Sequence, residues 1–303
     1  MRRLIVTADD FGAAREVNEA VETAHRAGIL TAASLMVSGA AAADAVARAR
    51  LMPQLRVGLH LVLVEGRPTL PVRQVSRLVG ADGCFRSDMA ALGTAISFSR
   101  RTRSQLAAEI TAQFEAFGAT GLALDHCNAH KHFHLHPVIG RMLASIGRRF
   151  GVRAARVPRE PLAVLRKIEP STSRAPSLVT APFARLLQRR LRAAGLATPD
   201  QVFGLHWSGR MTRARLAGLI EHLPEGLTEI YLHPATGAYA GSAPGYRYRE
   251  ELEALTAPEI VRACRDGTLR LGGFADLCDS LSGDPAPAAG GARHILRRRE
   301  SIP

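Results

Sequence analysis

The sequence predicts an α/β fold, a distorted (β/α) barrel with parallel strands, on three observations. Short apolar runs typical of buried strands alternate with helical patterns roughly seven or eight times. Such alternation favours parallel strands joined by right-handed crossovers. Polar residues with metal-binding or catalytic chemistry follow several of the strands, at the end where such barrels build their active sites. An open doubly wound sheet binds ligands at the same end, but a barrel mouth gathers side chains from at least four strands more easily.

The length and composition predict one folded domain. A chain of 303 residues can bury a large core, and its 47% apolar and 22% charged residues are ordinary for a globular protein. The end of the chain is rich in Gly, Pro, Ala and Arg. We therefore expect a single barrel domain over residues 1–281 and a disordered basic tail over residues 282–303.

The predicted strands are short apolar runs separated by helices or irregular stretches. They span residues 4–7, 32–37, 56–61, 122–127, 152–157, 202–207, 228–232 and 268–271. The first helix is predicted by apolar residues at helical spacing, namely Val17, Ala20, Val21 and Ala24. Further helices are predicted over residues 40–50, 104–117, 212–222 and 250–265, with another beginning at Pro137. Residues 65–100 lack periodicity and predict an excursion over the site.

Polar residues stand at or just beyond the ends of separate predicted strands. Asp9 and Asp10 follow the first strand, His60 lies near the end of the third, and His233 follows the run over residues 228–232. A bend at a strand end can turn two adjacent carboxylates into the mouth, where one can bind a metal and the other can stay free as a base. A paired Asp is also common as a simple turn or helix cap. The addition of histidines favours a hydrolytic metal site with open coordination positions.

A run of alternating histidines over residues 128–137 is the strongest local signal. In an extended backbone the alternating side chains share one face, and that face would hold His130, His132, His134 and His136. Protonated imidazoles that crowd together repel each other, whereas neutral imidazole is a good ligand for divalent cations. The run therefore favours a metal site over a solvated histidine-rich loop.

Charge, aromatic content and cysteine content limit the binding partners and the kinds of metal site that we expect. Forty Lys and Arg against 27 Asp and Glu leave a net charge of +13, which suits phosphate, an acidic substrate or an anionic membrane. Only 5% of residues are aromatic and no nucleic-acid-binding motif is present, so we expect no nucleic-acid partner. The four cysteines have no CxxC spacing, which argues against a cysteine zinc site or a disulfide scaffold. Nothing in the sequence sets an oligomeric state.

Two features bear on localisation. The N-terminal apolar stretch is too short for a signal peptide, so we expect a cytoplasmic protein. Residues 178–196 place leucines and a phenylalanine among arginines, a basic amphipathic pattern that can lie on an anionic membrane. An ordinary barrel helix with a solvated arginine face gives the same pattern. Peripheral contact with the inner face of the membrane therefore stays open.

Four motifs resemble, in order, those of YdjC-like carbohydrate deacetylases, the family of chitooligosaccharide deacetylase. They are Thr7-Ala8-Asp9-Asp10-Phe11-Gly12, Gly58-Leu59-His60-Leu61, Asn128-Ala129-His130-Lys131-His132-Phe133-His134 and Tyr231-Leu232-His233-Pro234-Ala235. The resemblance covers about residues 2–275. The residues of the histidine motif are most similar to those of the branch associated with hopanoid biosynthesis.

The resemblance implies a metal-dependent hydrolase that removes the acetyl group from an N-acetylated amino sugar and gives acetate and a free amine. The branch implies a glycolipid substrate, an N-acetylglucosaminyl hopanoid. One divalent metal ion is implied. The two imidazoles among its implied ligands favour zinc, nickel or cobalt over magnesium, and zinc is the choice we favour.

The resemblance also implies a role for each matching residue. The implied metal ligands are Asp10, His60 and His130, with Asp9 as the general base and His233 as the acid for the departing amine. Substrate contacts are implied for Arg156, His132 and His134, where Arg156 would orient a carboxylate or the acetyl oxygen. Several relatives carry Asp where this chain has Asn128, which would make the metal site here less negative.

Two other functions are consistent with the same residues. A metal-dependent phosphoesterase would also use Asp and His at strand ends, but it usually has more carboxylates than Asp9, Asp10 and Asp125 provide. A non-enzymatic histidine-rich metal-binding protein would bind several ions per chain and would tolerate loss of Asp9. Phosphate release and metal stoichiometry, respectively, separate these alternatives from a deacetylase.

Overall fold

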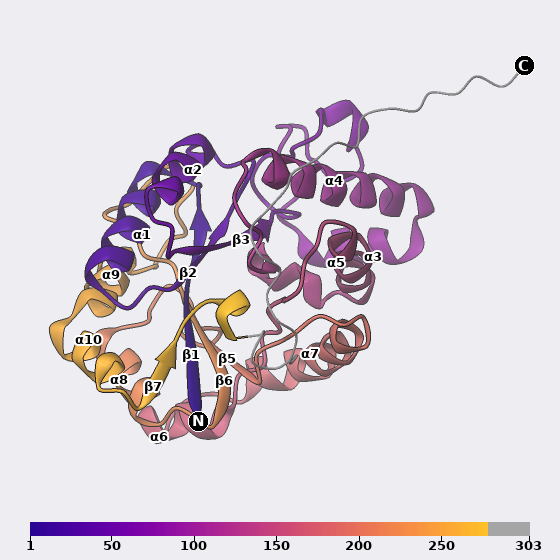
Figure 1. The fold of residues 1–303 in the computed structure, drawn as a ribbon. Helices are drawn as coiled ribbons and strands as arrows, with labels where there is room; N and C mark the ends of the chain where they lie inside the picture. Colours follow the sequence, from indigo (N-terminus) through magenta and orange to yellow (C-terminus); the bar gives the residue numbers. More distant parts are fainter. Residues whose placement is uncertain (278–303) are drawn as a thin grey trace, which may run out of the picture.

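The computed structural model describes residues 1–277, whose helices surround a central sheet (Figure 1). The strands within this range are β1 (Arg2–Phe11), β2 (Ala32–Leu35), β3 (Arg56–Leu61), β4 (Cys127–Ala129), β5 (Gln201–Phe203), β6 (Gly226–Leu232) and β7 (Leu269–Leu271). Their order is β4-β3-β2-β1-β6-β5, with β7 paired to β1. Every strand pair is parallel, which confirms the predicted α/β class. The expected tail over residues 282–303, like the last residues of the expected domain, lies outside the described range.

The gap between edge strands β4 and β5 is spanned by the irregular segment 153–159. The backbone N–H of Cys127 donates to the carbonyl of Ala154 at 3.1 Å, and that of Ala155 donates to the carbonyl of Ala197 at 3.0 Å. The predicted strand over residues 152–157 is thus present only as isolated bridges. Pro158 has no N–H to donate, which limits regular pairing in this segment. These bridges make the sheet a distorted barrel.

The strand with the most neighbours in the sheet is β1. Its residues from Leu4 to Phe11 are buried, and it lies between β6 on one side and β2 and β7 on the other. A strand covered on both faces reads as a continuous apolar run, which explains Leu4-Ile5-Val6. The C-terminal end of β1, with Asp9 and Asp10, therefore opens in the middle of the barrel mouth.

The helices cover the outside of the sheet (Figure 1). Their bounds are α1 (Arg15–Ala27), α2 (Ala42–Arg50), α3 (Met89–Phe98), α4 (Arg100–Ala119), α5 (Pro137–Arg149), α6 (Leu162–Ile168), α7 (Ala175–Ala193), α8 (Arg213–Glu221), α9 (Tyr248–Thr256) and α10 (Pro258–Arg265). The predicted apolar face of α1 is buried, and Pro137 begins α5 as expected. The single helix predicted over residues 250–265 is wrong: Pro258 starts a second helix because proline cannot continue the first.

The excursion over residues 65–100 contains more structure than its sequence indicates. It holds a short 3-10 helix (Val72–Gln74) and α3. The buried carboxylate of Glu109 on α4 accepts hydrogen bonds from the backbone N–H groups of Thr69 and Leu70, at 2.8 and 3.0 Å. The excursion is therefore anchored to α4 by polar contacts, which apolar periodicity does not reveal.

Contact with a membrane surface does not require a helix that crosses the bilayer. Within residues 1–277, none of the helices combines the length and the apolar character needed to cross a bilayer.

Candidate metal and catalytic site

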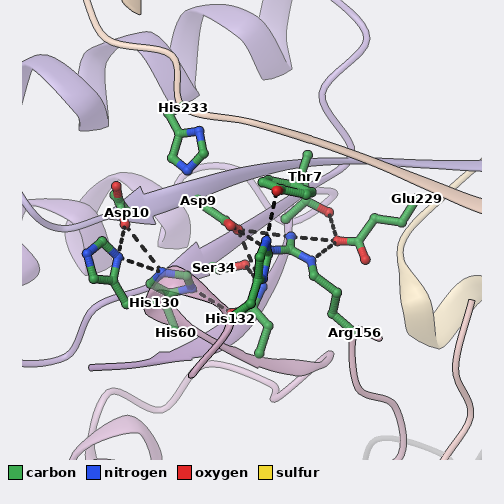
Figure 2. A network of polar contacts seen from close by, with 12 residues as sticks. Thr7, Asp9, Asp10, Ser34, His60, His130, His132, Arg156, Glu229 and His233 are labelled. Atoms are coloured by element: carbon green, nitrogen blue, oxygen red, sulfur yellow. Dashed lines mark hydrogen bonds and ion pairs between the residues drawn. The ribbon is translucent and has the colours of Figure 1, made fainter. Parts of the chain in front are cut away.

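The end of β1 bends so that two adjacent carboxylates serve two different neighbourhoods. Asp10 has φ of 62°, in the left-handed region, and the pairing register between β1 and β2 shifts between Ala8 and Phe11. Non-glycine residues rarely adopt this conformation, and such strain is found preferentially at functional sites. The side chain of Asp9 meets Arg156 while that of Asp10 meets His60 and His130, as Figure 2 shows. The predicted bend is confirmed.

Asp10, His60 and His130 converge on one point at the barrel mouth (Figure 2). Oδ1 of Asp10 lies 3.1 Å from Nδ1 of His130 and 3.3 Å from Nε2 of His60, and these two ring nitrogens are 3.4 Å apart. All three ligand atoms lie within 4.8 Å of one another. The residues come from β1, from β3 and from the position after β4. One carboxylate and two imidazoles at this spacing fit a divalent cation with positions left for water and substrate.

The carboxylate and the imidazoles of this cluster shift each other's pKa values. Burial by itself would raise the pKa of Asp10, but the charges and hydrogen bonds of His130 and His60 hold it well below its ordinary value. For His60 burial acts against the charged form, and the neighbouring carboxylates of Asp9 and Asp10 outweigh it and raise the pKa. The cluster thus attracts positive charge, which a metal ion would supply.

Asp9 is held by a buried arginine. The Arg156 guanidinium is fully buried and donates through both terminal nitrogens to the two oxygens of Asp9, at 2.5 and 2.9 Å. It also donates to Oε1 of Glu229 and lies 4.4 Å from the centre of the Tyr231 ring. Burial opposes the charge of Asp9, but Arg156 outweighs it and holds the pKa of Asp9 well below its ordinary value. Asp9 is therefore a fixed, ionised carboxylate beside the metal cluster.

The position of Arg156 corrects its predicted substrate contact. Its side chain has 0% exposure and lies behind Asp9, so no surface is left for an acetyl oxygen. The carboxylate that it orients belongs to the protein itself. The buried guanidinium pairs with two carboxylates, Asp9 and Glu229. An unpaired charge at this depth would lower the stability of the fold.

The histidine run does not form one extended face, so that prediction is wrong. Residues 130–135 form 3-10 turns in which Lys131 and His132 have φ of 52° and 53°. The left-handed turn points successive rings in different directions. Of the four imidazoles, only that of His130 joins the cluster of Asp10 and His60.

The other three histidines make separate contacts. Nε2 of His132 lies 2.7 Å from the Tyr231 hydroxyl, and the His132 side chain lines the cavity. His134 is fully buried, with Nε2 3.0 Å from the carbonyl of Arg156, and burial lowers its pKa to about 4. His136 caps α5 by accepting from the N–H of Val138. Direct substrate contact thus fits His132 and does not fit His134.

A cavity of about 420 Å³ opens beside the cluster. It is lined by Asp9, Asp10, His60, His130, His132, His233 and all four tyrosines of the chain, Tyr231, Tyr239, Tyr246 and Tyr248. The Tyr246 ring packs directly against Gly209, which has φ of 67°. A Cβ atom at residue 209 would lie 2.1 Å from this ring, so only glycine fits there. Tyr239, Tyr246 and Tyr248 form a tyrosine wall, which the sequence patterns did not predict. Its signal was the clustering of tyrosines within residues 231–248 of an aromatic-poor chain.

His233 follows β6 and faces the carboxylates. Figure 2 shows its ring above Asp9 and Asp10, across from His60 and His130. Within the described residues its Nδ1 is buried without a hydrogen-bond partner. Burial lowers the pKa of His233, against the opposing charges of Asp10 and Asp9. The backbone N–H of His233 donates to Glu251, which fixes the start of the loop after β6.

Known proteins resemble this chain over most of its length. A family model described as YdjC-like protein matches residues 3–266. A carbohydrate deacetylase of Homo sapiens is 32% identical and covers 94% of this chain and 94% of its own length. A carbohydrate deacetylase of Brevibacillus brevis is 30% identical, over 91% of this chain and 99% of its own length.

A crystal structure from Enterococcus faecalis V583, described as a candidate cellobiose-phosphate cleavage protein, has a TM-score of 0.69 to this chain. It covers 91% of this chain and 98% of its own at 22% identity, which shows a shared fold. The matched family model spans β1 to α10 and so includes every residue of the metal cluster. The chain therefore belongs to the YdjC-like family.

Proposed function

We propose that this protein is a metal-dependent carbohydrate N-deacetylase that converts an N-acetylated amino sugar into acetate and a free amine. The observation that carries the proposal is the cluster of Asp10, His60 and His130 beside a second carboxylate, Asp9, that is not part of it. Relatives over nearly the whole chain are named carbohydrate deacetylases, which supports the same reaction.

The residues divide the chemistry between them. Asp10, His60 and His130 would hold one divalent cation, which when bound polarises a carbonyl and makes its water acidic. Asp9 stays ionised at neutral pH because Arg156 stabilises its charge, and we assign its carboxylate the role of base, with a basicity that the same contact lowers. His233, on the other side of the carboxylates, would donate a proton to the departing nitrogen from its charged form, which the nearby charges of Asp10 and Asp9 favour and burial opposes. Two imidazoles and one carboxylate favour zinc, with cobalt and nickel as substitutes and magnesium less suited.

The cavity supports a sugar as the substrate. Its volume of about 420 Å³ is within the range typical of small-molecule sites. The tyrosine wall offers aromatic faces and hydroxyls, and a pyranose ring presents both apolar C–H groups and hydroxyls. The similarity of the histidine motif to the hopanoid-associated branch leads us to propose an N-acetylglucosaminyl hopanoid lipid as the natural substrate.

Mass spectrometry of the reaction products tests the function. The metal-loaded protein is incubated with N-acetylglucosaminyl lipids and, separately, with N,N′-diacetylchitobiose, and we expect loss of one acetyl group and release of acetate. Preference for the lipid supports the glycolipid substrate, and preference for chitobiose contradicts it. Phosphate release from phosphomonoesters without acetate release would indicate a phosphoesterase. Binding of several ions per chain with no turnover would indicate a metal-binding protein.

We also propose peripheral contact with an anionic membrane through α7. Its inner residues Ala184, Leu187 and Leu191 are buried, so α7 is a barrel helix. Its outer face exposes Phe183 at 45% and Leu186 at 37%. The exposed residues of α7 include Arg185 and Arg189. Each arginine near anionic lipid contributes about 1 kcal/mol.

Vesicle co-sedimentation tests the membrane contact. We expect binding to vesicles that contain phosphatidylglycerol and little binding to phosphatidylcholine alone. The double variant Arg185→Gln/Arg189→Gln should release the protein from the anionic vesicles, while Arg213→Gln on α8 should not. Equal binding to both kinds of vesicle would contradict the proposal.

A further inference from the structure

A chain of buried hydrogen bonds leads from the metal cluster into the barrel core. Oδ1 of Asn128 lies 2.6 Å from Nδ1 of His60, and Nδ2 of Asn128 lies 2.8 Å from the Ser34 hydroxyl. That hydroxyl is 3.0 Å from Nε2 of His126, whose Nδ1 is 2.9 Å from Oδ2 of Asp125. All five side chains are buried, and only His60 among them lines the cavity. The proposed reaction uses none of Asp125, His126 or Ser34.

The direction of these hydrogen bonds is set at Asp125. Its two oxygens accept from the backbone N–H groups of Phe274 and Ala275, at 3.2 and 2.8 Å, and from the His126 ring. A ring that donates from Nδ1 in its neutral form has a lone pair on Nε2. The Ser34 hydroxyl must then donate to His126, and its oxygen accepts from Nδ2 of Asn128.

This direction determines which nitrogen of His60 is free. With Nδ2 of Asn128 on Ser34, Oδ1 faces His60 and accepts its Nδ1–H. Nε2 of His60 is then unprotonated and lies 3.3 Å from Oδ1 of Asp10, as a metal ligand requires. A metal-binding histidine normally donates its other N–H to such an acceptor.

The opposite orientation of the Asn128 amide has the opposite effect. It places Nδ2 on His60, and Oδ1 then lies 3.1 and 3.2 Å from the two terminal nitrogens of Arg156 and 2.8 Å from the Ser34 hydroxyl. In the first orientation these guanidinium donors face Nδ2, which is itself a donor, so Arg156 favours the turned amide. His60 would then accept at Nδ1 and carry its proton on Nε2, which blocks metal binding. Ser34 bonds to the amide in both orientations, but when it donates to His126 it can only accept from Asn128. The pair of His126 and Ser34 and the guanidinium of Arg156 therefore favour opposite orientations of the Asn128 amide.

His126 is held in place by packing as well as by Asp125. Its ring stacks on Phe274 with centroids 4.4 Å apart. Residue 58 must be glycine because a Cβ atom there would lie 2.5 Å from the His126 ring. A ring fixed on three sides can hold the Ser34 hydroxyl in one direction.

We propose that Asp125, His126 and Ser34 are positioning residues that hold the Asn128 amide so that His60 presents an unprotonated Nε2 to the metal. The inference rests on the proposed metal dependence and adds residues from the barrel core to the metal site. It also gives Asn128 a reason to be an amide, since one oxygen serves His60 and one N–H group serves Ser34.

Metal affinity without substrate provides the first test. Zn²⁺ affinity is measured by chelator competition and Co²⁺ binding by its absorption spectrum. Asn128→Leu should lower affinity about 10- to 100-fold, because His60 loses its acceptor. Asn128→Asp should stay within a few-fold of wild type, because a carboxylate oxygen still accepts from His60. Ser34→Ala should lower affinity and change the Co²⁺ spectrum, because the amide is freed to turn toward Arg156.

Gln113→Leu is the matched control, since it also removes a buried amide, but one that bonds to the backbone of Val62 and to none of the cluster side chains. It should lower the melting temperature without changing Zn²⁺ affinity. Wild-type affinity in both Asn128→Leu and Ser34→Ala would overturn the inference and leave the proposed function intact. Absence of Zn²⁺ and Co²⁺ binding by the wild-type chain would overturn both.

A second measurement needs no variant. Long-range ¹H–¹⁵N spectra of the metal-free protein report which ring nitrogen of each histidine carries a proton. At a pH above the raised pKa of His60, where its ring is neutral, we expect Nδ1–H tautomers for both His60 and His126. An Nε2–H tautomer of His60 would overturn the inference even if the variants fail to fold.

Discussion

Asp9 and Asp10 are neighbours in the chain yet have separate surroundings at the scale of single residues. Asp10 meets two imidazoles, whereas Asp9 meets a guanidinium. The first surroundings attract a cation, and the second keep a carboxylate ionised without blocking its access to the cavity. A left-handed φ at Asp10 separates the two side chains. Each carboxylate therefore suits one task and not the other.

Substitution of Asp9 by Asn tests the base. The amide keeps the shape but cannot accept a proton, so turnover should fall about 100- to 10,000-fold. Metal stoichiometry should stay at that of the wild type, because Asp9 is not one of the three clustered ligands. Acetate release and metal content are measured on the same preparation. Near-normal turnover would remove Asp9 from the base role.

The burial of Arg156 predicts a large stability effect. Arg156→Met leaves Asp9 and Glu229 buried without their partner, and breaking such a pair costs about 3–5 kcal/mol. Arg213→Met is the control, because Arg213 also pairs with a glutamate but on the exposed surface. Urea unfolding of both metal-free variants gives the free energies. Equal losses in the two variants would contradict the assigned role of the buried pair.

Helix α7 has one face that packs in the barrel and one face that is exposed. Its inner face packs on α5, where Leu187 fills the space that a side chain at Gly140 would need. Its outer face carries the exposed Phe183 and Leu186. The amphipathic pattern of the sequence is the same for a barrel helix and for a membrane-contact helix, so only packing separates them.

Two adjacent leucines of α7 test this division. Leu187→Ala should cost about 2–5 kcal/mol of unfolding free energy, because the side chain is 3% exposed and its loss leaves a cavity. Leu186→Ala should change stability by less than about 0.5 kcal/mol, because that side chain is on the outer face. Urea unfolding measures both. A larger loss for Leu186→Ala would show that the outer face is packed.

At the scale of the whole molecule, the site depends on the closed arrangement of distant segments. Asp9 and Arg156 are separated by 147 positions, and Asp10 and His130 by 120. The irregular segment 153–159 delivers Arg156 between β4 and β5, where it reaches the centre of the barrel. Unfolding therefore removes the site as a unit, and buried charges and imidazoles couple stability to pH.

Acid should weaken the metal-free fold between about pH 6.5 and pH 4. Burial lowers the pKa of His134 to about 4, so the folded state resists its protonation while the unfolded state, with an ordinary pKa near about 6.5, does not. The unfolded state then binds more protons in this window, and stability falls as pH falls. The loss from this residue is on the order of 3 kcal/mol.

Urea unfolding across this pH range measures the effect. His134→Gln keeps an N–H donor for the carbonyl of Arg156 but does not titrate, so its stability should change less over the same window. Below about pH 4 further losses are expected in both proteins, because the pKa values of Asp9 and Asp10 are depressed in the fold. Identical pH profiles between pH 6.5 and 4 would exclude His134 as the cause.

The local sequence pattern by itself determined the fold class and most of the candidate site residues. Alternating apolar runs specified parallel strands, and the ends of those strands named Asp9, Asp10, His60, His130 and His233. The reason is physical: strand periodicity and burial are short-range properties, and parallel strands of a barrel must bring their C-terminal ends to one mouth. The family followed from the same motifs.

Only the tertiary structure decided which neighbours these residues have. Left-handed turns at Lys131 and His132 separate the histidines, and the alternation of histidines in the sequence does not indicate these turns. Several contacts join segments that are far apart in sequence. They are the contact of Arg156 with Asp9, the tyrosine wall, and the hydrogen bonds that connect Asp125 to Asn128 through Ser34. Such contacts depend on how the barrel closes and on where burial forces charges and hydrogen bonds to pair, which local periodicity does not encode.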